Sequence, residues 1–348
     1  MTHIPTIALT HGDINGIGYE TILKAFEDER LAELCTPVLF GSSKILAFYR
    51  RQLGLNTTYN VIKDTAEAKP GVLNVIECID DDIRVEPGKS SEQAGKAAFA
   101  SLEAAVKALT DKRVDALVTA PINKKNIQSS DFEFPGHTEY LESVAGNNMK
   151  ALMVLSDENV RIALATTHLP MTEIPAVITT ENVLEKIRLF NKSLKRDFGV
   201  HHPRIAVLAL NPHAGEEGLL GNEERDAIIP AVEAAKAEKI MAFGPYAADG
   251  FFGSGRFVKF DGVLAMYHDQ GLAPFKLMSM DAGVNFTAGL PWVRTSPDHG
   301  TGYDISGRGE ASPHSMRQAV YQAIDIVRNR QRDDEAHKNP LKPQNSEN

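Results

Sequence analysis

Cysteine is scarce in this chain of 348 residues, which contains only Cys35 and Cys78. With these two residues, neither a CxxC motif nor a zinc-finger spacing is possible. Each lies beside an apolar run, and we expect both to be small buried thiols. So little cysteine fits the reducing environment of the cytoplasm, where we expect the protein to be located.

Long hydrophobic runs and an excess of basic residues are also lacking. No stretch approaches the roughly 20 apolar residues that span a membrane, and residues 1–6 do not begin a signal peptide, so we expect no membrane partner. The net charge of −9 and the pI near 5.7 argue against a nucleic-acid partner, which would require a basic surface. A small anionic substrate, held by a few local cations, is compatible with this charge.

Apolar runs of strand length alternate with helical patterns along the chain, which predicts an α/β fold with largely parallel strands. We expect strands at 7–9, 37–40, 72–76, 116–119, 152–155, 162–165, 205–210, 240–243 and 263–267. Helices are expected at 92–109, with Ser90 and Gln93 as a capping box, and at about 183–194, 223–237 and 313–330. The polar end, residues 331–348, has no periodicity and is predicted to be a disordered tail.

Three histidines each follow an expected strand: His168, His213 and His268. In open α/β sheets, ligands bind beyond the carboxyl ends of the strands. The three imidazoles could therefore converge on one divalent cation and leave a position open for substrate. The alternative is three unrelated surface histidines. His201 and His202 lack this context, and we assign them to the surface.

Several other residues indicate an anion-binding site. Gly136 precedes His137 and Thr138 at a predicted helix start, where backbone amides suit an anion, unless Thr138 is simply the N-cap. Lys276, Arg294 and Asn285 could hold a phosphate or a carboxylate. The alternative for the lysine and the arginine is solvated surface charge.

The segment 298–309 contains four glycines within ten residues and could approach a ligand closely. It is a candidate for binding a cofactor phosphate or ribose, unless it is an ordinary long loop. Gly16-Ile17-Gly18 resembles part of a dinucleotide fingerprint, but Thr21 stands where the third glycine would be. We therefore reject a Rossmann interpretation.

Taken together, these segments resemble the 4-hydroxythreonine-4-phosphate dehydrogenases of pyridoxal phosphate biosynthesis. The matching segments occur in the family's order over residues 6–325: 12–18, 119–124, 136–139, 165–170, 211–216, 266–271, 294–296 and 298–301. The resemblance implies a two-domain α/β fold of the isocitrate/isopropylmalate dehydrogenase-like type, with largely parallel sheets and an interdomain cleft. The first domain would comprise residues 1–130 and 280–330. The second would comprise residues 131–279, with most metal ligands and the dimer contacts.

The resemblance also implies a homodimer whose active site is shared between the subunits. It places one divalent metal on His168, His213 and His268. It places the substrate, a small phosphorylated hydroxy amino acid, on five residues: His137, Thr138, Lys276, Asn285 and Arg294. NAD or NADP would be held by His299, Gly300, Thr301, Asp304, Gly307 and Gly309. Three imidazoles suit zinc or cobalt, then nickel or manganese, and magnesium would fit if carboxylates join.

The chain departs from the family pattern at several positions. His11, Ile14, Asn15 and Tyr19 change the first loop, Asn123 stands where a histidine is common, and Tyr303-Asp304 follows Gly302. These changes leave the three histidines intact. They leave the substrate open among related four-carbon phosphates, such as D-threonate or D-erythronate 4-phosphate.

The expected reaction is metal-dependent oxidation of the substrate's secondary hydroxyl, with hydride transfer to nicotinamide. The resulting β-keto acid would then lose carbon dioxide to give an aminoketone phosphate. Asp269 could orient the site and Lys276 could take the proton. A metal-dependent phosphohydrolase or acyl transferase could use the same histidines but needs no nicotinamide loop. A non-catalytic metal- or phosphate-binding protein would leave the Lys, Asn and Arg set unexplained.

Overall fold

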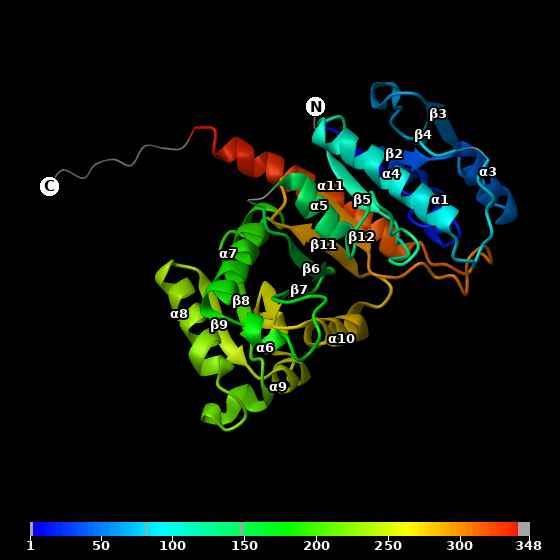
Figure 1. Ribbon diagram of the computed structural model, residues 1–348. Helices are drawn as coiled ribbons and strands as arrows, with labels where there is room; N and C mark the ends of the chain where they lie inside the picture. The colour runs from blue at the N-terminus through cyan, green and yellow to red at the C-terminus, as the bar shows by residue number, and fades with distance from the viewer. Residues whose placement is uncertain (1–2, 81, 147–148, 340–348) are drawn as a thin grey trace.

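The computed structural model describes residues 3–80, 82–146 and 149–339. Its strands form a single 12-stranded sheet in the order β3-β4-β2-β1-β5-β12-β11-β6-β7-β10-β8-β9 (Figure 1). The strands are β1 Thr6–Thr10, β2 Thr36–Gly41, β3 Tyr59–Ile62, β4 Leu73–Glu77, β5 Ala116–Thr119, β6 Leu152–Ser156, β7 Arg161–Leu164, β8 Arg204–Leu208, β9 Met241–Tyr246, β10 Gly262–Ala265, β11 Val284–Ala288 and β12 Val293–Pro297.

Helices connect most of these strands. The α-helices are α1 Gly18–Ala25, α2 Glu29–Leu34, α3 Ser43–Gln52, α4 Glu92–Thr110, α5 His137–Ala145, α6 Ile174–Val177, α7 Thr180–Arg196, α8 Ile229–Ala237, α9 Ala248–Gly253, α10 His268–Ser279 and α11 His314–Ala336. Shorter helical turns are η1 Thr65–Glu67, η2 Pro212–Gly218, η3 Glu224–Ile228 and η4 Arg256–Lys259. Among the described residues, no helix is long and apolar enough to cross a membrane.

The sheet contains two parallel sets of strands that run in opposite directions. One set is β3-β4-β2-β1-β5-β12 and the other is β7-β10-β8-β9. β11 and β6 lie between the sets and are antiparallel to their neighbours. The turn between β11 and β12 includes Gly289 at φ +85, where a Cβ would lie 2.1 Å from the Lys150 carbonyl oxygen. Only glycine fits this turn without displacing backbone.

Helices cover both faces of the sheet, which explains why its strands read as continuous apolar runs. In β1, Ile7 and Leu9 pack in the same core as residues of α1 and α11, whereas Ala8 packs with residues of α4. In β10, Leu264 packs with the buried face of α7, whereas Val263 and Ala265 pack with residues of α9 and α10. The α/β fold class with a largely parallel sheet is therefore confirmed.

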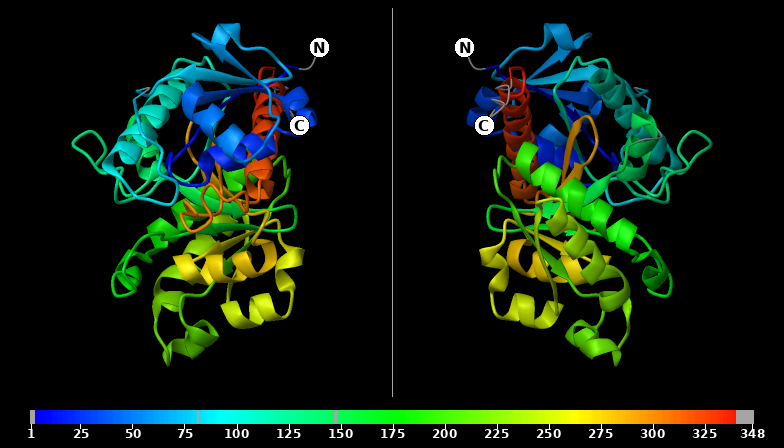
Figure 2. Two further views of the ribbon diagram at one scale, coloured as in Figure 1. Left: turned by 90° about the vertical axis from the view of Figure 1, so that its right-hand side faces the viewer. Right: turned by 90° about the vertical axis from the view of Figure 1, so that its left-hand side faces the viewer.

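The two parallel sets gather different parts of the chain. Figure 2 shows the N-terminal strands and helices together with α11 on one side, and the elements of residues 152–279 on the other. β11 and β12 return to the middle of the sheet from near the C-terminal end. Both sets belong to one hydrogen-bonded sheet, and the division into domains 1–130 plus 280–330 and 131–279 stays a prediction.

Two expected helix ends are corrected by the structure. The N-cap of α4 is Ser91, whose hydroxyl accepts from Ala94 N, whereas the hydroxyl of Ser90 accepts from Asn123. The final helix, α11, continues to Ala336, and Arg196 forms ion pairs with Asp333 and Asp334 beyond the expected end. The expected disordered tail thus begins too early at 331, and residues 340–348 lie outside the described residues.

A buried histidine in the first loop predicts acid sensitivity. His11 is fully buried, stacks on Tyr19 with ring centroids 4.9 Å apart, and donates from Nδ1 to the Gly12 carbonyl. Burial lowers the pKa of His11 from 6.5 to about 4. Between these values the unfolded chain binds the proton and the folded chain does not, so stability is lost as the pH falls. The expected loss between pH 6.5 and pH 4 is about 3 kcal/mol of unfolding free energy.

This contribution is measured by urea unfolding of wild type and His11→Asn across that pH range. The asparagine can keep a donor near the Gly12 carbonyl but does not titrate. The variant should therefore show a flatter dependence on pH, while His201→Asn, at an exposed position, should follow wild type. Parallel curves for wild type and His11→Asn would contradict the prediction.

Candidate functional site

The ends of β7, β10 and β8, which precede the three predicted metal ligands, are tied together by hydrogen bonds. Ala165 N donates to the Ala265 carbonyl at 2.8 Å, and the Thr166 hydroxyl donates to the Met266 carbonyl at 2.7 Å. Gln270, in the first turn of α10, donates to the Ala209 carbonyl at 2.6 Å. These bonds fix the strand ends from which the histidine loops depart.

His168 and His268 lie side by side, with ring centroids 5.9 Å apart. Lys124 Nζ is 3.4 Å from His168 Nε2, and because an ammonium can only donate, this nitrogen accepts. The ring proton of His168 is then on Nδ1, which faces Glu139 Oε1 at 3.7 Å. Nδ1 of His268 likewise faces Asp269 Oδ1 at 2.8 Å. Each ring therefore has Nδ1 facing a carboxylate, the arrangement typical of metal-binding histidines. Nε2 of His168 contacts Lys124, whereas no described residue hydrogen-bonds to Nε2 of His268.

His213 occupies a different kind of loop. It is exposed and has φ +52, within η2, and the loop is held by Glu224, whose Oε1 accepts from Leu210 N and Asn211 N. Within the described part of one chain, no three His, Cys, Asp or Glu side chains are grouped to hold a metal. The predicted triad is thus represented by two neighbouring rings, and the participation of His213 stays a prediction.

Arg294 is the most unusual cation of the site. It lies on β12, is only 4% exposed, and donates to the hydroxyls of Thr119 and Thr287 at 2.7–3.1 Å. None of the ion pairs among the described residues includes it. Burial lowers its pKa to about 10, so the guanidinium remains charged at neutral pH. A buried cation with hydroxyl partners is well suited to bind an anion.

His137 and Thr138 begin α5, as predicted. His137 is buried, and no described residue is a hydrogen-bond partner of its Nε2. Burial, followed by the charges of Arg294 and Lys124, holds the pKa of His137 well below 6.5, so the ring is neutral. Thr138 lines a hollow of about 460 Å³ together with Glu139 and His168.

Asn285 and Lys276 complete the predicted substrate set. Asn285 lies on β11, two residues before Thr287, and its Oδ1 is buried without a hydrogen-bond partner among the described residues. Lys276 is exposed on α10 and acts electrostatically on Asp298, as does His268. Burial raises the pKa of Asp298, and these two cations oppose the rise. The end of β12 therefore lies close to α10.

Three residues in this site have no role in the sequence-based prediction: Lys124, Glu139 and Asp298. All three lie inside segments that carry the family resemblance, and Lys124 and Glu139 both contact His168. The motif positions were therefore the available signal. Their roles depend on contacts between segments far apart in the sequence.

The predicted cofactor loop packs on the first loop and on α1. Ile17 N donates to the Thr301 carbonyl, and Ser306 Oγ donates to the carbonyls of Asn15 and Gly16. Gly16 permits this approach, because a Cβ there would lie 2.7 Å from the Thr301 oxygen. The Gly16-Ile17-Gly18 segment thus packs against a neighbouring loop, which agrees with our rejection of a Rossmann dinucleotide fingerprint here.

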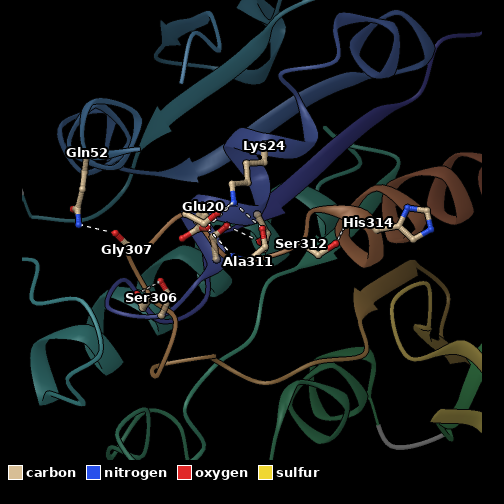
Figure 3. Close-up of polar contacts among 12 residues, drawn as sticks. Glu20, Lys24, Gln52, Ser306, Gly307, Ala311, Ser312 and His314 are labelled. Carbon is tan, nitrogen blue, oxygen red and sulfur yellow. Dashed lines mark hydrogen bonds and ion pairs between the residues drawn. The ribbon is translucent and has the colours of Figure 1, made fainter. Parts of the chain in front are cut away.

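The far end of this loop is anchored by side chains of α1 and α3 (Figure 3). Gln52 donates to the Gly307 carbonyl, and Lys24 donates to the carbonyls of Gly309 and Ala311. At the near end, His299 is half-buried, and its Nε2 has no hydrogen-bond partner within the described residues. Gly300 and Asp304 are exposed. The predicted cofactor residues therefore share one anchored loop that begins beside Asp298.

The arrangement defines a class of protein: an α/β enzyme in which paired imidazoles, a buried guanidinium on a strand and a glycine-rich loop occur together. Similarity to known proteins narrows this class. The family described as "Pyridoxal phosphate biosynthetic protein PdxA" matches residues 33–323, and the chain belongs to this family.

Relatives cover nearly the whole chain. A protein of Bacteroides thetaiotaomicron named 4-hydroxythreonine-4-phosphate dehydrogenase is 54% identical over 97% of this chain and 93% of its own. The crystal structure of 4-hydroxythreonine-4-phosphate dehydrogenase from Klebsiella pneumoniae has a TM-score of 0.81 at 35% identity, covering 93% of this chain and 98% of that one. A relative from Oceanobacillus iheyensis, provisionally named D-threonate 4-phosphate dehydrogenase, is 38% identical over 94% of this chain and 99% of its own.

Proposed function

We propose that this protein oxidises 4-phosphohydroxy-L-threonine with NAD or NADP, in a metal-dependent step of pyridoxal phosphate biosynthesis. The product would be 2-amino-3-oxo-4-phosphobutanoate, which decarboxylates to 3-amino-2-oxopropyl phosphate. The names of relatives at up to 54% identity support the activity. The observation that carries the proposal is the buried Arg294 guanidinium, held by threonine hydroxyls. It lies near the neutral His137, whose Nε2 has no hydrogen-bond partner among the described residues.

The residues fit a divalent metal. His168 and His268 both direct Nδ1 to a carboxylate, and His213 of a second subunit would supply the third imidazole. A metal in this position would polarise the substrate hydroxyl and stabilise the alkoxide that develops during oxidation. The donor set favours zinc or cobalt, and the nearby carboxylates keep magnesium among the ions to test.

The chain's own groups would bind and orient the substrate. Arg294 and His137, with Thr138, Asn285 and Lys276, would hold its phosphate and carboxylate ends. Asp269 would fix the orientation of His268 through Nδ1. Lys276 Nζ would exchange the proton of the substrate hydroxyl. His299, Gly300, Thr301, Asp304, Gly307 and Gly309 would hold the nicotinamide cofactor, which accepts the hydride.

Oxidation of D-threonate 4-phosphate is a second candidate function, favoured by the name of the Oceanobacillus relative. This substrate carries a hydroxyl where 4-phosphohydroxy-L-threonine carries an amino group. Both have a phosphate and a carboxylate, so Arg294 and His137 fit either. The group at the second carbon would decide between the two substrates.

The test is a panel of 4-phosphohydroxy-L-threonine, D-threonate 4-phosphate and D-erythronate 4-phosphate, each with NAD and with NADP. The absorbance of reduced nicotinamide should rise with one preferred substrate. This reaction should stop after the metal is removed by chelation and should resume when zinc, cobalt or magnesium is added. Phosphate release is measured in parallel. Phosphate release without nicotinamide reduction would instead identify a phosphohydrolase and overturn the proposal.

A further inference from the structure

Two departures from the family pattern contact each other. Asn123, where a histidine is common, follows β5, and Tyr303 lies in the predicted cofactor loop. Asn123 Nδ2 donates to the Tyr303 hydroxyl oxygen at 3.0 Å. Asn126 Nδ2 lies 3.4 Å from the same oxygen. The tyrosine hydroxyl therefore joins the loop after β5 to the loop 298–309.

The same hydroxyl serves a buried carboxylate. Asp13 is 1% exposed, and its Oδ2 accepts from the Tyr303 hydroxyl and from Asn126 Nδ2, both at 2.7 Å. Its Oδ1 accepts from Asn15 N at 2.8 Å. Across the described ranges, none of the ion pairs includes Asp13. A buried carboxylate held by neutral donors depends strongly on each of them.

Tyr303 is suited to be a permanent donor. It is half-buried, and burial, followed by the hydrogen bond to Asp13, raises its pKa to about 12. The phenol therefore keeps its proton over the physiological pH range. Gly88 permits the close packing of this residue, because a Cβ on Gly88 would lie 2.8 Å from the Tyr303 carbonyl oxygen.

The hydroxyl also has a distinct place in the loop. Residues 306–311 are held by Ser306, Gln52 and Lys24 (Figure 3). Between residues 299 and 305, as far as the structure describes the chain, Tyr303 is the side chain that hydrogen-bonds outside the loop. Without its hydroxyl, the near part of the loop would retain the backbone bond from Ile17 N to the Thr301 carbonyl.

We propose that Tyr303 is a positioning residue whose hydroxyl, bonded to Asp13 and Asn123, holds residues 299–305 in the conformation that receives the nicotinamide cofactor. The inference rests on the proposed function, which assigns the cofactor to this loop. Asn123 is followed by Lys124, which contacts His168. The bond to Asn123 therefore also sets the cofactor loop relative to the segment that reaches the paired histidines.

The test is Tyr303→Phe, which removes the hydroxyl and keeps the ring. If the binding conformation becomes fractionally populated, the apparent Kd rises by the inverse of that fraction. We expect NADH or NADPH, titrated by fluorescence without substrate, to bind roughly tenfold more weakly, the loss that follows from one hydrogen bond to a charged group. The KM of the nicotinamide should rise similarly, while kcat at saturating cofactor and the KM of the phosphorylated substrate should stay within about twofold.

Two further variants separate positioning from general damage. Tyr321→Phe is the matched control, because no described residue hydrogen-bonds to the Tyr321 hydroxyl, and it should bind cofactor like wild type. Asn123→Ala should weaken cofactor binding more in wild type than in Tyr303→Phe, because the part of its effect that passes through the Tyr303 hydroxyl is already lost in that variant. Its remaining effect comes from Asn123 Oδ1, which also accepts from Lys125 N and Asn126 N.

The outcomes distinguish this inference from the proposed function. Unchanged cofactor affinity in Tyr303→Phe, with wild type binding nicotinamide, overturns the positioning role alone. If kcat and thermal stability fall and both KM values rise to a comparable extent, the positioning role is overturned as well, in favour of general damage to the fold. If wild type binds neither NADH nor NADPH, the proposed function fails and this inference fails with it.

Discussion

Replacing His213 with alanine is expected to lower kcat/KM by more than about 100-fold and to weaken metal binding. Replacing a residue that only orients a metal ligand already costs about 10- to 100-fold in metal affinity or activity, and removal of a ligand should cost more. One chain assembles only part of the proposed site: His168 and His268 lie together, whereas no three such ligands group within its described residues. His213, exposed on η2, would then complete the site of a second subunit.

Mixing two inactive variants tests this shared arrangement directly. Dimers of His213→Ala and dimers of His268→Ala should each be inactive. After dissociation and random reassociation, half of the dimers are hybrids with one intact site, so about one quarter of wild-type activity should return. Activity and bound metal should return together. If all ligands came from one chain, no hybrid would contain an intact site, and continued inactivity after verified exchange would contradict the shared site.

Several of the strands that sequence reasoning located are buried on both faces. β1, β2, β5 and β8 are continuous apolar runs because helices cover each side. The buried positions Val183, Ile187, Phe190 and Leu194 similarly confirm the predicted face of α7. In these elements the local pattern and the tertiary environment agree.

Several of the elements that were missed carry polar groups or lie at an edge. β11 and β12 contain Asn285 and Arg294, two residues of the predicted substrate set, and their polar side chains interrupt the apolar pattern. β3 is a short edge strand with a partly exposed face. α10 contains Gly271 and Pro274, two residues of low helix propensity, so the sequence pattern did not indicate a helix there. In the middle of the sheet, short turns join β6 to β7 and β11 to β12, and each turn makes its two strands antiparallel. An apolar pattern does not encode the direction in which a strand runs.

The candidate site shows the same division. Strand-end position was enough to select His168 and His268, and the contact between their rings supports that choice. The hydrogen bonds from Arg294 to the hydroxyls of Thr119 and Thr287 connect β12 with β5 and β11. The Lys124 contact with His168 joins residues that lie 44 positions apart in the sequence. Such pairings depend on how the sheet is assembled. They were reachable only through the family motifs that contain these residues.

Replacing Lys24 with methionine is expected to destabilise the fold by about 3–5 kcal/mol, because it leaves a buried carboxylate without its counter-charge. Glu20 is fully buried, and its Oε1 lies 2.8 Å from Lys24 Nζ and accepts from Ala311 N. The lysine also donates to the carbonyls of Gly309 and Ala311 (Figure 3). Its loss removes a charge pair and two anchors of the predicted cofactor loop.

Chemical unfolding of three variants measures this effect and identifies its cause. Lys96→Met removes a lysine from the exposed Glu92 pair, where side-chain exposures are 69% and 79%, and should change stability by less than about 1 kcal/mol. Glu20→Gln/Lys24→Met should be more stable than Lys24→Met, because it leaves no buried charge, while the amide oxygen can still accept from Ala311 N. Equal stability of Lys24→Met and Lys96→Met would show that the Glu20 carboxylate is hydrated in solution. A double variant no more stable than Lys24→Met would assign the loss to the two carbonyl anchors instead of to the charge.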